Sequence, residues 1–135
     1  MKKVLAFLLV VLTVFSLLSC TAIAFSDEPR WNNTSSGTVS LVINDTGKAT
    51  VSLVCIGISG VTTKITAETK LERKWGLLWL DVEEWTDVSN STNLVTSHYV
   101  QLDKKATYRA KTKYTVTGTG GANDTFTCEC DYTYD

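Results

Sequence analysis

The segment "LDKKATYRAKTKYTV", residues 102–116, carries the clearest structural signal in the chain. After a polar turn, "DKKA", side chains that suit a core alternate with side chains that suit water. The first set comprises Tyr108, Ala110, Thr112, Tyr114 and Val116, and the second comprises Arg109, Lys111 and Lys113. Successive residues of a β-strand point to opposite faces, so this period of two predicts a strand that is buried on one face only.

The same alternation extends over most of the chain. The expected strands cover residues 39–43, 49–58, 64–72, the tryptophan segment 75–85, and then 94–102, 107–116 and 125–134. Turn-forming segments such as "NDTGK", "SNSTN" and "GTGGAND" separate them. About seven strands at this spacing, with no helical period after the first 24 residues, favour an all-β sandwich of antiparallel strands. A closed barrel is the alternative.

The first 24 residues predict a secretory signal peptide with its helix. A basic start precedes an apolar run at residues 4–18, which is shorter than the roughly twenty residues that span a bilayer. Ala22-Ile23-Ala24 follows as a small-x-small cleavage pattern. The chain is therefore expected to be secreted and extracellular, with a signal peptide at 1–24, an extended segment at 25–37 and a sandwich domain at 38–135.

Two alternatives to a cleaved signal remain open. One is an uncleaved N-terminal anchor. The other is a lipoprotein held at the cell surface through Cys20, because "LLSC" at residues 17–20 loosely resembles a bacterial lipobox. Membrane contact of that kind requires lipidation at Cys20.

The charge balance argues against nucleic-acid partners. The full chain has a formal net charge of −1, and removal of Lys2 and Lys3 with the signal would leave −3. This is too mild for an electrostatic nucleic-acid footprint. The chain has a single proline and no linker, charge run or repeat, so one domain is expected, and no motif indicates a cofactor.

The cysteines predict one disulfide. Removal of the signal leaves Cys55, Cys128 and Cys130, and an oxidising compartment favours one pair with one leftover thiol. Cys128 and Cys130 lie two apart on one expected strand, too far along it for an easy bond. Cys55 is therefore expected to pair with Cys128, with Cys130 as the alternative partner. A zinc site is not expected, because the chain has one histidine and no second closely spaced cysteine pair.

One local feature narrows the fold. "LDKKATYRA" (102–110) resembles the start of strand F in immunoglobulin and fibronectin type III domains, where a tyrosine closes a corner. In antibody domains a cysteine follows that tyrosine by two residues, and here Ala110 stands in its place. The resemblance implies that the third and sixth strands are neighbours. Glu68 and Glu72 would then form a ladder of opposite charges with the basic row at 109–113. This row is therefore expected to be a solvent-exposed face with paired charges and not a binding patch.

Two further motifs resemble an uncharacterised family of small secreted proteins from Gram-positive, mostly anaerobic gut bacteria. "PRWNNTSS" (29–36) matches that family's P-R-W-x-N-T-S-S pattern, and Trp79, Val82 and Trp85 match its W-x-x-V-x-x-W pattern. The resemblance implies an immunoglobulin-like sandwich and an extracellular location, and implies no activity or cysteine pairing. In a bacterial protein, the five N-x-S/T sequences would serve turns and strand ends rather than carry glycans.

The tryptophan segment "WGLLWLDVEEW" (75–85) supplies the candidate binding site. In an unbroken strand one face would hold Trp79, Asp81, Glu83 and Trp85, and the opposite, core face would hold Leu78, Leu80 and Val82. Two exposed rings beside two carboxylates would suit stacking on sugar rings, as in many carbohydrate-binding modules.

A structural reading of the same tryptophans competes with the binding site. A β-bulge at Glu83-Glu84 would shift the register and return Trp85 to the core with Val82. Trp75 is expected to cap a sheet end at a turn around Gly76. Trp31 is expected to fix the N-terminal segment.

No catalytic residues are expected. His98 is the only histidine and has no nucleophile motif or glycine-rich loop with it. Asp81 and Glu83 resemble the acid and base of a glycosidase in spacing, but both are expected to be solvated.

The sequence thus predicts a monomeric, non-enzymatic binding or adhesion module for an extracellular glycan or protein of a cell envelope or host, with no cofactor or metal. One alternative is a small secreted effector, of the bacteriocin or toxin kind, whose tryptophans engage a membrane. The other is a purely structural surface protein. Dye leakage from lipid vesicles would indicate the effector, and retention on immobilised polysaccharide would indicate the binder.

Overall fold

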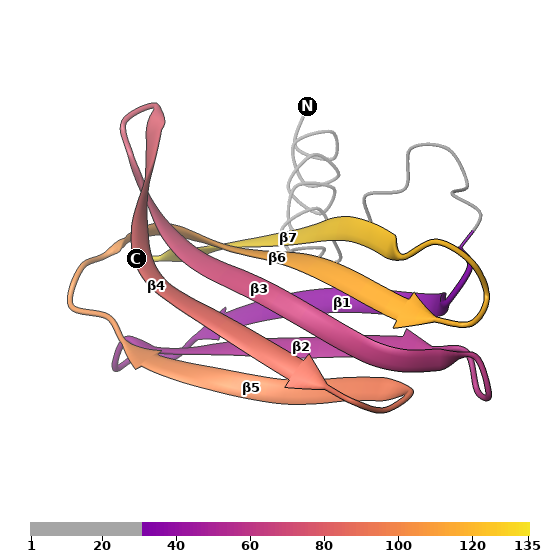
Figure 1. The fold of residues 1–135 in the computed structure, drawn as a ribbon. Helices are drawn as coiled ribbons and strands as arrows, with labels where there is room; N and C mark the ends of the chain where they lie inside the picture. Colours follow the sequence, from indigo (N-terminus) through magenta and orange to yellow (C-terminus); the bar gives the residue numbers. More distant parts are fainter. Residues whose placement is uncertain (1–30) are drawn as a thin grey trace, which may run out of the picture.

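A computed structural model of the protein describes residues 31–135. This part of the chain folds into two antiparallel β-sheets that pack against each other (Figure 1). The strands are β1 (Thr34–Ile43), β2 (Lys48–Gly57), β3 (Thr62–Trp75), β4 (Leu78–Ser89), β5 (Asn93–Gln101), β6 (Ala106–Gly118) and β7 (Asp124–Tyr134). The predicted sandwich of about seven antiparallel strands is confirmed. The predicted signal peptide, with its helix and cleavage site, lies outside the described residues. The strand β1 begins at Thr34, inside the segment 25–37 predicted as an extended lead-in to the sandwich.

The sheet orders are β1-β2-β5 and β4-β3-β6-β7. No strand pairing joins the two sheets in the part of the chain described, so the closed-barrel alternative is wrong. In constant-type immunoglobulin domains the fourth strand pairs with the fifth, whereas β4 here pairs with β3. As a result β4 and β5 form the edges on one side of the sandwich. On the other side β1 packs closely against β7.

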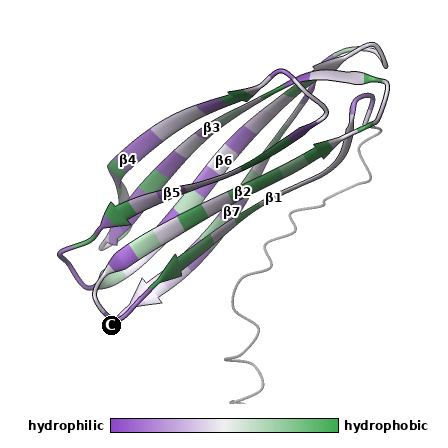
Figure 2. Cartoon of the chain, turned by 90° about the horizontal axis from the view of Figure 1, so that it is seen from below, coloured by the Kyte–Doolittle hydropathy of each residue, from purple (hydrophilic) through white to green (hydrophobic). Residues whose placement is uncertain are grey.

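The core comprises the inward side chains of both sheets. Its largest fully buried apolar members are Leu41, Val51, Leu53, Ile65, Leu71, Tyr108, Tyr114 and Val116. Figure 2 shows the underlying alternation as purple and green bands along the strands. Each such side chain contributes about 1.5–3 kcal/mol when it is removed from water. The inward set predicted from residues 102–116 is therefore confirmed, because period-two alternation decides which face of β6 is buried.

The outer face of the four-stranded sheet carries the predicted charge ladder. In the register between β3 and β6, Glu72 faces Arg109 and Glu68 faces Lys113. The first pair forms an ion pair, and Lys113 Nζ lies 4.0 Å from a Glu68 carboxylate oxygen. Lys111 pairs instead with Glu129 on β7, at 3.4 Å. The pairs of Lys111 and Lys113 are exposed, and exposed pairs contribute about 0–1 kcal/mol each. Because every cation of the row has an acidic partner, the row is a neutralised surface and not a free cationic patch.

Two tyrosines tie the sheets at fixed points. The Tyr108 hydroxyl donates a hydrogen bond to the Lys104 carbonyl oxygen at 2.6 Å, which confirms the predicted corner at the start of β6. The Tyr114 hydroxyl donates to the Thr38 carbonyl oxygen, also at 2.6 Å, and so links β6 to β1 of the other sheet. Burial raises the pKa of both phenols, which keeps both hydroxyls protonated as donors.

A buried carboxylate fastens the start of β1 to the start of β7. Asp124 accepts hydrogen bonds from the Asn32 and Asn33 amides at 3.0 and 2.7 Å and from the Thr34 hydroxyl at 2.8 Å. We call this group, Asn32, Asn33, Thr34 and Asp124, the amino-terminal clasp. Burial alone would raise the pKa of Asp124, but these hydrogen bonds outweigh it and hold the pKa below its ordinary value.

The motif at 29–36 therefore has a structural role in its described part. The Asn33 side chain is fully buried and bonds the Ala122 carbonyl and the Gly120 amide. Trp31 packs edge-to-face on Phe126, with ring centroids 4.6 Å apart. The N-x-S/T sequence at Asn33 thus serves a strand start. The Asn44 side chain likewise accepts hydrogen bonds within its turn.

Candidate functional site

The tryptophan strand β4 changes its facing pattern at Val82. The register between β3 and β4 pairs Leu71 with Glu83 and Glu72 with Asp81, which leaves Val82 without a partner. Residues that pair across antiparallel strands share a face. Leu71 points into the core and Glu72 points outward, so this β-bulge sends Asp81 and Glu83 to opposite faces of β4.

The expectation that Trp79, Asp81, Glu83 and Trp85 share one outer face is therefore wrong. The bulge leaves Trp79 and Asp81 on the outer face and turns Glu83 and Trp85 to the inner side. The competing reading is confirmed in part. A bulge does return Trp85 to the core side, but the bulge lies at Val82 and not at Glu83-Glu84, and Val82 itself is exposed. A platform of two coplanar rings is not formed, and the carboxylates of Asp81 and Glu83 do not converge.

Trp85 closes the open side of the sandwich. Its ring is half-buried against the core and stacks on the imidazole of His98 from β5, with centroids 4.8 Å apart and planes 8° from parallel. The His98 Nε2 atom lies 2.7 Å from a carboxylate oxygen of Asp87, also on β4. These contacts hold the β4 edge of one sheet to the β5 edge of the other. The single histidine and Trp85 thus have a shared structural role.

Trp79 is also partly covered, on the outer face. The guanidinium carbon of Arg109 lies 4.1 Å from the centre of its ring, a cation–π contact. Beside it, a carboxylate oxygen of Asp81 lies 3.6 Å from Lys70 Nζ. A hydrogen bond from Lys70 to Glu84, with Asp81 nearby, raises the pKa of this lysine. Trp79 and Asp81 therefore belong to the outer face of the four-stranded sheet, where acidic and basic side chains pair with each other. We call this outer face the charge-paired face.

The expected core face of the tryptophan strand is exposed instead. Leu78, Leu80 and Val82 were predicted to line the core, but all three are exposed. The reason is their position, because the end of the β3–β4 hairpin extends past the sandwich and no strand of the opposite sheet lies over it (Figure 1). Pairing of β3 with β6 ends at Arg73, so residues 74–79 form a two-stranded ribbon by themselves.

This hairpin end is the most apolar exposed feature of the described chain. We define the hairpin tip as residues 75–80, "WGLLWL", which contains no charged residue. Leu77 is 97% exposed, Trp75 66% and Leu78 59%. Other large exposed apolar residues, such as Val42 on β1 and Val95 on β5, belong to separate strands. Contiguous exposed apolar patches mark interaction sites, whereas single exposed residues are common.

The tip forms because of its turn. Trp75 pairs with Leu78, so Gly76 and Leu77 make a two-residue loop, and Gly76 has a φ of 61°. Glycine adopts that value without strain, which allows the tight hairpin. The prediction of a turn around Gly76 is confirmed, but Trp75 projects from the hairpin and covers no sheet end. A run of apolar residues around a glycine turn, with no polar turn residue, is the signal that identifies the tip from sequence.

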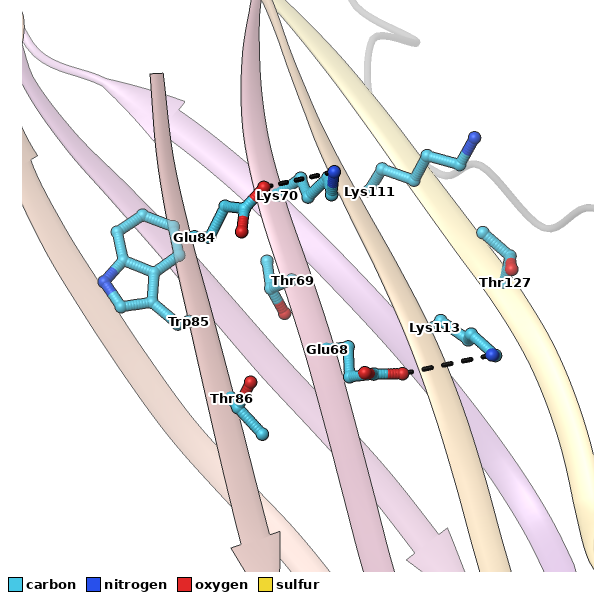
Figure 3. Close-up of a pocket in the computed structure, with 9 residues that line it drawn as sticks. All are labelled: Glu68, Thr69, Lys70, Glu84, Trp85, Thr86, Lys111, Lys113 and Thr127. Carbon is cyan, nitrogen blue, oxygen red and sulfur yellow. Dashed lines mark ion pairs between the residues drawn. The ribbon is translucent and has the colours of Figure 1, made fainter. Parts of the chain in front are cut away.

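The four-stranded sheet also has a shallow groove on its outer face, of about 310 Å³. Its lining residues are Glu68, Thr69, Lys70, Glu84, Trp85, Thr86, Lys111, Lys113 and Thr127 (Figure 3). Each charge along it has a partner: Lys70 Nζ lies 3.1 Å from Glu84, Lys113 Nζ lies 4.0 Å from Glu68, and Lys111 pairs with Glu129 of β7. The groove is therefore part of the charge-paired face and offers no unpaired charge to a ligand.

The predicted disulfide is absent from the structure. Cys55 and Cys128 are free, buried thiols, and Cys130, the alternative partner, is not a free thiol. Cys128 lies over β1, where its Sγ is 3.4 Å from the Gly37 carbonyl oxygen. Burial, and to a lesser extent Cys128, raises the pKa of Cys55 to about 12. Burial also raises the pKa of Cys128.

Residues 31–135 contain no cluster of side chains suited to a metal ion. Within the same range there is no helix that could span a membrane. The chain matches no family model, no curated protein and no solved structure.

Proposed function

We propose that this protein is a secreted, non-enzymatic binding module that contacts its partner through the hairpin tip. The observation that carries the proposal is the exposure of Trp75, Leu77 and Leu78 together at the end of one projecting hairpin. Such a patch is unfavourable in water and becomes favourable when a partner covers it.

The size of the effect indicates weak, reversible binding. Covering a whole side chain of this kind is worth about 1.5–3 kcal/mol. The exposed fractions of the three side chains together correspond to a gain of roughly 3–7 kcal/mol. Association costs offset part of this gain, so adhesion through many copies or a second attachment would strengthen it.

The arrangement of the other candidates supports a binding role more than catalysis. Asp81 and Glu83 point to opposite faces of β4, and His98 is stacked on Trp85 and bonded to Asp87. Because Trp79 and Trp85 lie on opposite faces, the tip is a better candidate contact surface than a sugar-stacking platform.

The proposal is tested by co-sedimentation of the mature chain, residues 25–135, with bacterial cell-envelope fragments. The double substitution Leu77→Ser/Leu78→Ser should remove retention, because it deletes the largest exposed apolar area. Val95→Ser, which changes an apolar residue on β5 that is 72% exposed, is the matched control and should be retained like the wild type. Equal thermal unfolding of all three proteins would show that the fold is unchanged.

Two results would contradict the proposal. One is retention that survives the double substitution. The other is retention on an insoluble polysaccharide that is lost on Trp79→Ala but survives Leu77→Ser/Leu78→Ser, which would support a glycan platform.

A further inference from the structure

We infer that the partner of the hairpin tip is the interface of a lipid bilayer with anionic headgroups, into which the tip inserts without crossing it. This rests on the proposed function and specifies its ligand. The alternative occupant, an apolar pocket on another protein, is distinguished by the experiment below.

The tip is apolar on one face and at its turn, and its other face carries the Trp79 ring beside Arg109 and Lys74. Trp75 and Leu78 pair on one face of the ribbon, with Leu80 on the same side, while Trp79 points to the other. Leu77, at the turn between them, is almost wholly exposed. A bilayer interface offers acyl chains to the apolar face and the turn, and headgroups to the aromatic ring and the cations beside it. A projecting tip of this composition therefore fits a bilayer interface.

The charges beside the tip are complementary to anionic lipids. The two residue pairs next to Trp75 and Leu78 contain Lys74 and Arg73 and no acid. The first acidic residues, Glu72 and Asp81, form the pair beyond them. Both already have partners, because Glu72 pairs with Arg109 and Asp81 with Lys70. Within residues 31–135, Lys74 and Arg73 form no ion pair with an acid. Lys74 Nζ lies 6.0 Å from the centre of the Trp79 ring and Arg73 interacts with the Tyr108 hydroxyl, so both keep a positive charge that an anionic headgroup can pair with.

The order of residues along the ribbon follows the layers of a bilayer surface. Leucines occupy the end, tryptophans flank them, and cationic side chains follow, which is the sequence from acyl chains to headgroups. The distance from the turn to the pair of Arg73 and Leu80 is roughly 10 Å at 3.3 Å per residue. Interfacial segments insert to about 5–10 Å.

The backbone of the hairpin limits how deeply the tip can insert into a bilayer. Beyond Arg73 the ribbon has no neighbouring strand from β6, so its outward amides and carbonyls are unpaired. Unpaired backbone groups are excluded from the hydrocarbon centre but tolerated near water. The tip should therefore anchor the protein at the interface and not open a pore.

The test uses the mature chain, residues 25–135, with vesicles of phosphatidylcholine alone or mixed with phosphatidylglycerol. The wild type should co-sediment more strongly with the anionic vesicles. Leu77→Ser/Leu78→Ser should lower partitioning at least about tenfold, equivalent to about 1.4 kcal/mol, and Val95→Ser should leave it unchanged. Lys74→Glu should weaken binding to the anionic vesicles more than to the neutral ones.

A second measurement locates the tip. Bromine atoms on the acyl chains quench a nearby tryptophan, so bound wild-type protein should lose fluorescence on brominated vesicles. Trp75→Phe should lower this quenching while the protein still co-sediments, with Trp79 remaining as the second tryptophan of the tip.

Three outcomes would overturn the inference: no vesicle binding by the wild type, equal binding by the double variant, or release of an encapsulated dye. If the chain does not bind vesicles but envelope fragments still retain it through the tip, the proposed function stands and the partner is a protein pocket. If tip-dependent retention is absent from both, the proposed function fails as well.

Discussion

Single polar residues hold parts of this domain together by hydrogen bonds that the alternation of apolar residues does not predict. The amino-terminal clasp is the clearest example, because one carboxylate satisfies three donors from the start of β1. Asp124 is only 5% exposed. A buried carboxylate with this many donors favours its charged form, which explains the direction of its pKa shift.

Asp124→Asn should destabilise the domain by about 2 kcal/mol at pH 7, because a neutral amide replaces a charged acceptor. The folded-state pKa of Asp124 is lowered, so the contribution is fully present above the unfolded value of about 3.9 and is lost as pH falls through the folded value. Denaturant unfolding at several pH values should therefore show the difference shrinking below about pH 4.

Asp45→Asn is the control for this prediction. Asp45 lies exposed in the turn between β1 and β2, so its substitution should change stability by less than about 0.5 kcal/mol. A pH-independent gap between wild type and Asp124→Asn would contradict the assigned role of the carboxylate.

At the scale of elements, the β3–β4 hairpin has two parts, a base that packs in the sandwich and an end that projects from it. Its base, held by Trp85 against His98 of β5, closes the sandwich. Its end leaves the sandwich and carries the exposed apolar tip. The bulge at Val82 separates the two, because it sets the faces of the residues on either side of it.

Deletion of Val82 should be tolerated. The flanking pairs, Leu71 with Glu83 and Glu72 with Asp81, already have the spacing of a regular ladder once the unpaired residue is gone. Deletion of Thr86, a paired residue, shifts the register by one and turns the rest of the strand to the wrong faces. This second deletion should cost at least about 3 kcal/mol, through the loss of Trp85 from the core.

Denaturant unfolding of the two deletion variants, followed by tryptophan fluorescence, measures this difference. Comparable losses of stability would indicate that the bulge itself is needed for the hairpin. A more stable Thr86 deletion would refute the register described for β4.

At the scale of the whole molecule, the two sheets bury two free thiols between them. Cys55 comes from β2 of one sheet and Cys128 from β7 of the other. The raised pKa of Cys55, about 12, means that only about one thiol in ten thousand is ionised at pH 8. Since the thiolate is the reactive form, both burial and protonation protect these residues.

Iodoacetamide at pH 8 should therefore label neither Cys55 nor Cys128 in the folded protein. In denaturant without a reductant both should react, because the thiol pKa returns to about 8.5. Mass spectrometry of the peptides gives the result, and Ser40→Cys, on the exposed side of β1, should label in the folded state. Labelling of the pair only after reduction would instead reveal the disulfide that the sequence suggested.

The sequence by itself determined the strands, their buried faces and the corner at Tyr108, because each depends on local alternation or on a contact within a few residues. It also determined that Glu68 and Glu72 would meet the basic row once β3 and β6 were neighbours. Only the tertiary structure decided which side chains of the tryptophan segment face the core and which are exposed. One unpaired residue, Val82, reverses the facing of everything beyond it, and whether Leu78 and Leu80 are core or surface depends on how far the opposite sheet extends. Alternation along a strand reports which side chains share a face, but it contains no information on what lies across from that face.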